Sequence, residues 1–216
     1  AGLGGWIRQE ANALERTLQL DPTLNDAHFG VGLYHYYADV APAAAKVLRW
    51  LLFLPGGDRA TGLREMLQAR DKGELLRGEA DFQLHVVYLW YEHKTEDALN
   101  LLARLDARYP NNPIFLQLSA DIHDTYLHDR VASAAAWRAL VARAVAGTVY
   151  SARTTEVRAR FGLASELAAM NRSADAIDEL QRIVDMRPIE PIGARERAER
   201  ELRAAINAEG LELAAI

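Results

Sequence analysis

The residues with the strongest potential for chemistry lie close together near the middle of the chain. Asp121, His123, Asp124 and His128 combine carboxylates with imidazoles, and zinc uses both kinds of ligand. Two histidines five residues apart do not share a helical face, whereas the histidine pair of zinc proteases is four apart and does. A hydrolase built around these four residues is therefore our third hypothesis, and we expect no catalytic site, no metal and no cofactor.

Motifs for nucleophilic or nucleotide chemistry are absent from the rest of the sequence. It contains no G-x-S-x-G, no phosphate loop and no dinucleotide-binding fingerprint. Because the chain has no cysteine, it also has no thiolate metal site and no cysteine nucleophile. We therefore expect that the protein is not an enzyme.

Composition and charge limit the classes of partner. Half of the residues are apolar, a quarter are charged, and the net charge is -5 with the two signs interleaved. Without a basic stripe, we expect no nucleic-acid partner. The longest apolar stretch, Val40 to Pro55, is shorter than the ~20 residues of a membrane span and contains Lys46 and Arg49. We therefore predict no transmembrane segment, and the cellular compartment stays open.

One pattern of small and bulky residues recurs along the chain. In its best copy Ala98 is followed by Leu102, Leu105 and Pro110. The first three lie on one helical face, where the small residue lets another helix approach, and the proline ends the helix. The other copies are Ala176, Leu180, Ile183 and Pro188; Gly62, Met66, Ala69 and Glu74; Ser133, Trp137, Leu140 and Val145; and an opening copy of Leu14, Thr17 and Pro22. Two of the intervals between copies are close to the ~34-residue period of helix-pair repeats.

Helix-forming residues and turn signals predict an all-α fold in a single domain, 1–216. The predicted helices are 4–20, 24–39, 42–54, 58–72, 77–93, 95–109, 113–127, 130–145, 151–170, 173–187 and 193–208, the last being a charged capping helix. The long interval after Pro22 indicates an insertion at about 40–57. Its apolar helix 42–54 is expected to be buried, and Asp58 is expected to cap the helix that follows.

The chain resembles the tetratricopeptide repeat family over essentially its whole length. The motif copies above carry the resemblance, together with Gly32 in NDAHFGVGLYHYYA and Ala164 in RFGLASELAAM. It implies a right-handed superhelix of helix pairs, an α-solenoid, with one inserted helix. Residues 30–63 also resemble a eukaryotic tetratricopeptide family linked to the mitochondrial outer membrane and inclusion-body clearance. The opening helix has no first-helix partner, so we expect Ala1 to lie inside a longer protein.

The resemblance also implies a binding groove. In this family the first helices of successive pairs line a concave surface, and its positions carry over through Gly32, Ala98, Pro113 and Ala164. The expected groove residues are Phe29, Leu33, Tyr36, Tyr37, Gln83, Val87, Trp90, Tyr91, Asp121, Asp124 and Arg158, with Gln117 and Phe161. Such a groove would be aromatic at one end and charged at the other. For each aromatic residue, packing between repeats is the alternative.

Two function hypotheses from different classes follow. The leading one is a non-catalytic scaffold that binds a protein or peptide partner in the groove, anchored by Tyr36, Tyr37, Trp90 and Tyr91, with Arg158 available to an acidic partner. The alternative is a membrane-peripheral or self-assembling structural protein that uses the helix 42–54. In that case weak contact with a membrane surface or with another copy of the chain would pass through the insertion.

Overall fold

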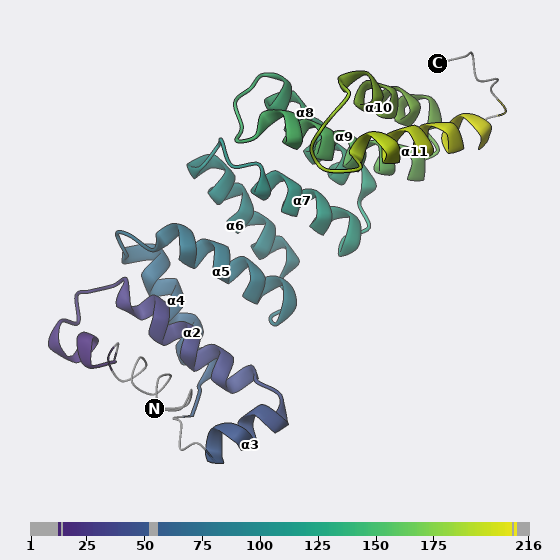
Figure 1. Ribbon diagram of the computed structural model, residues 1–216. Helices are drawn as coiled ribbons and strands as arrows, with labels where there is room; N and C mark the ends of the chain where they lie inside the picture. Colours follow the sequence, from purple (N-terminus) through teal and green to yellow (C-terminus); the bar gives the residue numbers. More distant parts are fainter. Residues whose placement is uncertain (1–12, 14, 52–55, 209, 211–216) are drawn as a thin grey trace. The chain divides into compact units, whose positions relative to one another are not determined.

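The computed structural model describes residues 13, 15–51, 56–208 and 210, without the side chains of 48–51. These residues form helices and no strand, which confirms the all-α prediction (Figure 1). Residues 15–20 are helical. The helices that follow are α2 (Ala27–Val40), α3 (Ala43–Leu51), α4 (Arg59–Lys72), α5 (Arg77–Trp90), α6 (Thr95–Arg108), α7 (Ile114–Thr125), α8 (Arg130–Val145), α9 (Ala152–Ala169), α10 (Ser173–Met186) and α11 (Ala194–Ala208).

The chain forms two compact units, Ala1–Leu101 and Leu102–Ile216. In the N-terminal unit α4 packs against both α2 and α5. In the C-terminal unit each helix from α7 to α11 packs against the next one along the chain. Packing therefore follows sequence order inside each unit, as helix-pair repeats require. The single repeat domain remains a prediction.

Two glycines let α2 and α4 approach backbone to backbone. A Cβ atom at Gly62 would lie 2.4 Å from the amide nitrogen of Tyr36, and one at Gly32 would lie 2.8 Å from the carbonyl oxygen of Gly62. No side chain fits at either distance. Gly62, the small position of one motif copy, and Gly32 are therefore points where these two helices touch. Helix α3 lies between α2 and α4 in the sequence, inside the predicted insertion.

The core of the N-terminal unit gathers on the facing sides of α2, α4, α5 and α6. Its buried members are Tyr36, Met66, Leu84, Val87 and Leu101. Tyr36 and Val87 are both fully buried. This corrects the expectation that they face a groove, because a side chain packed on all sides in the core is not open to a partner.

The described part of the insertion is exposed. Asp58 caps α4 as predicted, since its carboxylate accepts a hydrogen bond from the amide of Thr61 at 2.6 Å. On α3, Lys46 and Val47 are exposed, with 58% of Val47 open to solvent. The other apolar side chains on which the predicted burial of 42–54 depends lie outside the described residues.

The C-terminal unit has a larger core shared by α7 to α11. The bulky motif residues Trp137, Leu140, Leu180 and Ile183 all belong to it. Helix α11 adds Ala194, Ala198 and Leu202 at intervals of four, so the densely charged last helix buries one small-residue face.

The described helices include none with the length and hydropathy needed to span a membrane.

Candidate functional site

A groove in the C-terminal unit brings together the charged end of the predicted site. It has a volume of about 530 Å³ and is formed by α7, α8, α9, α11 and the segment before α11. The lining residues are Gln117, Asp121, Asp124, Trp137, Arg158, Phe161, Gly162, Ser165, Glu166, Pro191, Ile192, Gly193, Ala194 and Arg197. Five residues expected from the sequence are among them.

Three carboxylates form one side of this groove. Asp121 and Asp124 lie one turn apart on α7, and Glu166 comes from α9. The side chain of Glu166 is only 7% exposed, and its Oε2 atom accepts no hydrogen bond from the described residues. Arg130 pairs with two of them, with Nη1 3.7 Å from Asp124 Oδ1 and 3.6 Å from Glu166 Oε2. Two of the three acids thus share one half-exposed arginine at distances longer than a hydrogen bond.

Glu166 and Asp121 hold their protons more tightly than ordinary carboxylates do. Burial raises the pKa of Glu166 and the negative charge of Asp124 raises it further, while the nearby Ser133 hydroxyl and Arg130 lower it in part. The pKa of Asp121 is raised by the same two causes in the same order. Since Asp121 is exposed and Glu166 is buried, the negative charge of Glu166 destabilises the folded protein more than that of Asp121 does. A cation bound in the groove would offset that destabilisation.

Two arginines contribute the positive charge of the groove. Arg158 on α9 is exposed and makes no hydrogen bond or ion pair with the described residues. Arg197 on α11 is already engaged, because its guanidinium lies 4.2 Å from the Phe161 ring centroid and its Nε donates to Glu201 at 2.7 Å. Arg158 is therefore the cation available to an anionic group of a ligand.

Aromatic and aliphatic side chains lie between the charged groups. Trp137 and Phe161 are buried but reach the groove surface, and a Cβ atom at Gly162 would lie 2.4 Å from the Trp137 indole. Glycine at this position lets α9 pack directly on the tryptophan ring. Ile192 stands at the rim with 96% of its surface exposed. The groove thus offers an apolar contact between opposite charges.

The structure distributes the predicted residues between the two units. Asp121, Asp124 and Arg158, with Gln117 and Phe161, line the C-terminal groove. Phe29, Leu33, Tyr36, Tyr37, Gln83, Val87, Trp90 and Tyr91 belong to the N-terminal unit.

The aromatic residues of the N-terminal unit form a packed cluster. The rings of Tyr36, Tyr37 and Tyr91 meet edge to face, with centroids 5.5 to 6.0 Å apart. The Tyr36 hydroxyl donates to Glu92 at 2.6 Å, and burial raises the pKa of this phenol. Gln83 Nε2 donates to the Tyr37 hydroxyl at 2.6 Å. These residues stabilise the unit, in line with the packing alternative.

The remaining predicted residues of that unit differ in exposure. Phe29, Leu33 and Tyr37 are partly buried, and Leu33 and Tyr37 pack against the core. Trp90 is 59% exposed, and Tyr91 is also exposed. Of the four proposed aromatic anchors, only Trp90 and Tyr91 offer substantial surface to a partner.

Sequence reasoning missed Glu166, Trp137, Ile192 and Arg197 as groove residues. A signal for Glu166 is present, because Arg158, Phe161, Gly162, Ser165 and Glu166 follow one another at i, i+3, i+4, i+7 and i+8, which is one face of α9. Ile192 and Arg197 come from the last loop and the last helix. Nothing in their local sequence indicates that this end of the chain lies beside α7 and α9.

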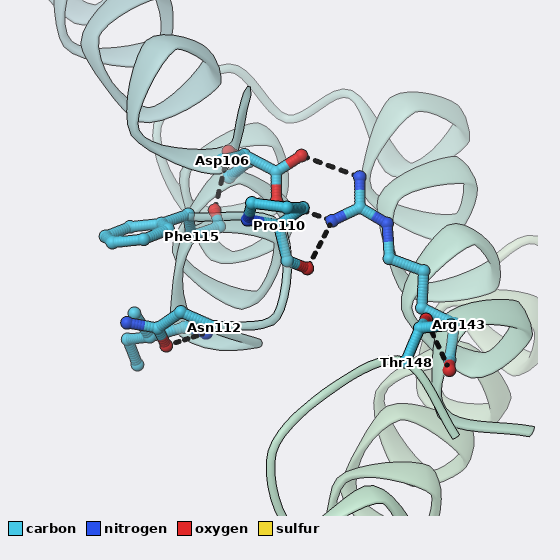
Figure 2. Close-up of polar contacts among 8 residues, drawn as sticks. Asp106, Pro110, Asn112, Phe115, Arg143 and Thr148 are labelled. Atoms are coloured by element: carbon cyan, nitrogen blue, oxygen red, sulfur yellow. Dashed lines mark hydrogen bonds and ion pairs between the residues drawn. The ribbon is translucent and has the colours of Figure 1, made fainter. Parts of the chain in front are cut away.

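Another charged cluster of the C-terminal unit is structural (Figure 2). Arg143 on α8 donates two hydrogen bonds of 2.7 Å to the carboxylate of Asp106 on α6. Arg143 Nη1 also approaches the carbonyl of Pro110 at 3.4 Å, and the Thr148 hydroxyl donates to the carbonyl of Arg143 at 3.1 Å. A two-pronged arginine–carboxylate pair of this kind fixes α8 against the end of α6. It leaves Arg143 little capacity to bind a ligand.

The histidine and aspartate cluster near residue 123 has no metal-binding geometry in the part of the chain that the structure describes. No group of three or more His, Asp or Glu side chains there could hold a metal ion. His128 is exposed just beyond α7, whereas the Nδ1 atom of His123 is buried without a hydrogen-bond partner. The two imidazoles therefore lie in different environments.

No protein-family model, curated protein or solved structure matches this chain.

Proposed function

We propose that the protein is a non-catalytic scaffold for protein–protein interaction, and that the groove of its C-terminal unit binds a peptide segment of a partner. The observation that supports this function is the set of side chains in one groove: three carboxylates, the apolar surface of Trp137, Phe161 and Ile192, and Arg158, which has no partner among the described residues. Peptide recognition uses such a combination of apolar area and a few charged contacts.

The proposed architecture is a tetratricopeptide-like right-handed superhelix. Helices packed in sequence order, small residues at the contact of α2 with α4, and buried bulky motif residues support it. In such an array the groove would be the concave surface of the C-terminal repeats. Trp90 and Tyr91 then supply a second, aromatic contact surface on the N-terminal unit.

The alternative of a membrane-peripheral or self-assembling structural protein is favoured by one observation. Val47 and Lys46 are exposed on α3, so the described side of this helix does not pack on the unit. Liposome flotation with anionic vesicles tests this alternative. Recovery of the protein with the vesicles would favour it, and protein left at the bottom of the gradient would exclude membrane attachment.

Selection of random linear peptides displayed on phage, against the whole chain, tests the peptide-binding function. We expect recovered peptides to lose binding to Ser165→Trp, because an indole on this exposed groove residue fills the space without changing charge. The matched control is Ala168→Trp, on an exposed position of the same helix that does not line the groove. Circular dichroism checks that both variants fold. If no peptide is recovered, or if both variants bind equally, the proposed function is wrong.

A further inference from the structure

We infer that the groove selects extended segments that carry one basic and one acidic residue about four positions apart, with an apolar residue between them. This inference rests on the proposed peptide-binding function and specifies its ligand. Three features of the groove support it. At one end, acidic side chains outnumber the single arginine paired with them. At the other end of the same face of α9 lies Arg158, which has no partner among the described residues, and apolar surface lies between the two ends.

The acidic end requires a cation. Asp121, Asp124 and Glu166 lie at this end, where Arg130 pairs with Asp124 and Glu166 only, and Glu166 Oε2 is buried without a hydrogen-bond partner among the described residues. A buried acceptor without a donor costs on the order of 1–3 kcal/mol. The ammonium of a lysine or the guanidinium of an arginine would supply both the donor and the missing charge. A neutral ligand supplies only the donor.

The arginine end requires an anion. Arg158 is exposed, lines the groove and has no partner among the described residues. A carboxylate can accept two parallel hydrogen bonds from its guanidinium. Arg197 is already engaged by Glu201 and the Phe161 ring, so the aspartate or glutamate of the ligand is placed at Arg158.

The helix fixes the spacing of the two charges. Arg158 and Glu166 are eight residues apart on α9, which is ~12 Å along the axis. An extended peptide advances ~3.3 Å per residue and turns alternate side chains to the same side. A separation of about four residues therefore matches the distance and puts both charged side chains toward the groove. The residue midway between them also faces the groove, near the level of Phe161 on α9.

Synthetic peptides with a lysine and a glutamate at separations of three, four and five, in both orders, test the inference on the whole chain. Fluorescence anisotropy in low-salt buffer gives the dissociation constants. We expect tightest binding at a separation of four in one of the two orders. Arg158→Glu should weaken that binding about tenfold, which corresponds to ~1.4 kcal/mol, while a peptide with lysine in place of its glutamate should regain affinity for this variant. Arg138→Glu, on an exposed α8 position outside the groove, is the matched control.

The possible results separate the inference from the function on which it rests. One result would overturn the inference and leave the peptide-binding function standing. In it, Ser165→Trp blocks peptide binding, but the dissociation constants depend neither on the spacing of lysine and glutamate nor on the charge swap at Arg158. Failure of all peptides from the phage selection would overturn both. Restored binding of the charge-swapped peptide to Arg158→Glu would support the inference, since a variant that merely misfolds gains no ligand.

Discussion

Glu166 and Asp26 show opposite uses of a carboxylate in the same fold. Burial and the negative charge of nearby Asp124 raise the pKa of Glu166, and the Ser133 hydroxyl and Arg130 offset only part of this rise. Asp26 accepts hydrogen bonds from the amides of residues 74, 75 and 76 at 2.9 to 3.3 Å, and these bonds lower its pKa. The first residue is costly when charged, and the second stabilises the fold when charged.

Replacing Glu166 by glutamine should stabilise the protein at pH 7 by on the order of 1 kcal/mol. The variant no longer buries a charge, and the lost ion pair with half-exposed Arg130 contributes only ~0–1 kcal/mol. Because the folded pKa is raised, the wild type should gain stability as the pH falls from that pKa toward the ordinary value of ~4.3. Urea unfolding at several pH values measures both effects. A variant less stable than the wild type at pH 7 would show that Glu166 is satisfied in the unliganded protein.

The substitution Asp26→Ala should destabilise the protein by about 1 kcal/mol at pH 7. It removes three acceptor contacts that join the start of α2 to the turn between α4 and α5, and solvent near this site screens part of their strength. Since the folded pKa is lowered, the stabilisation is present above the unfolded value of ~3.9 and is lost as the pH falls through the folded pKa. Thermal melts of wild type and variant should therefore differ at pH 7 and converge in strong acid. Asp178→Ala, at an exposed α10 position, is the control.

At the scale of single residues, the family resemblance places side chains on a groove by their repeat positions. Asp121, Asp124 and Arg158 are expected there on that ground, and the structure brings them together in one groove. Tyr36 and Val87 are expected there on the same ground and are buried. Burial depends on which neighbouring helix covers a face, and a single helix contains no information on that.

At the scale of helices, the contact between α2 and α4 depends on the absence of side chains at two positions. The spacing of small and bulky residues singles out Gly62, and the family resemblance singles out Gly32. The segment 187–193 and the approach of α11 to the groove had no such periodic signal. Local pattern thus predicts the elements, whereas the groove is lined by residues more than 70 positions apart in the sequence, such as Gln117 and Arg197.

Substituting Gly62 by alanine should destabilise the N-terminal unit by about 1–3 kcal/mol, despite the ~1 kcal/mol higher helix propensity of alanine. The added Cβ would lie 2.4 Å from the backbone nitrogen of Tyr36 and 2.6 Å from the carbonyl oxygen of Gly32, and neither backbone atom can move without shifting a helix. Valine at the same position should destabilise the N-terminal unit more than alanine does. Urea midpoints monitored by circular dichroism measure the series. Equal midpoints for glycine and alanine would mean that the helices separate at little cost.

At the scale of the whole molecule, each unit has a hydrophobic core of its own. The core around Met66 and Leu84 uses residues of the N-terminal unit, and the core around Leu180 and Ile183 uses residues of the C-terminal unit. Repeat proteins sum local stabilities and interfaces between neighbours, so different parts of one chain can open at different free energies.

A cavity made in one core should therefore destabilise its own unit more than the other. Met66 and Ile183 are both fully buried, so Met66→Ala and Ile183→Ala should each cost ~2–5 kcal/mol where they are made. Native-state hydrogen exchange measures this residue by residue. Met66→Ala should accelerate exchange in α4 and α5, Ile183→Ala should accelerate it in α9 and α10, and each should leave the other pair of helices close to wild type. If either substitution accelerates exchange equally in all four helices, the chain unfolds as one cooperative unit, which is the behaviour expected of a single domain spanning 1–216.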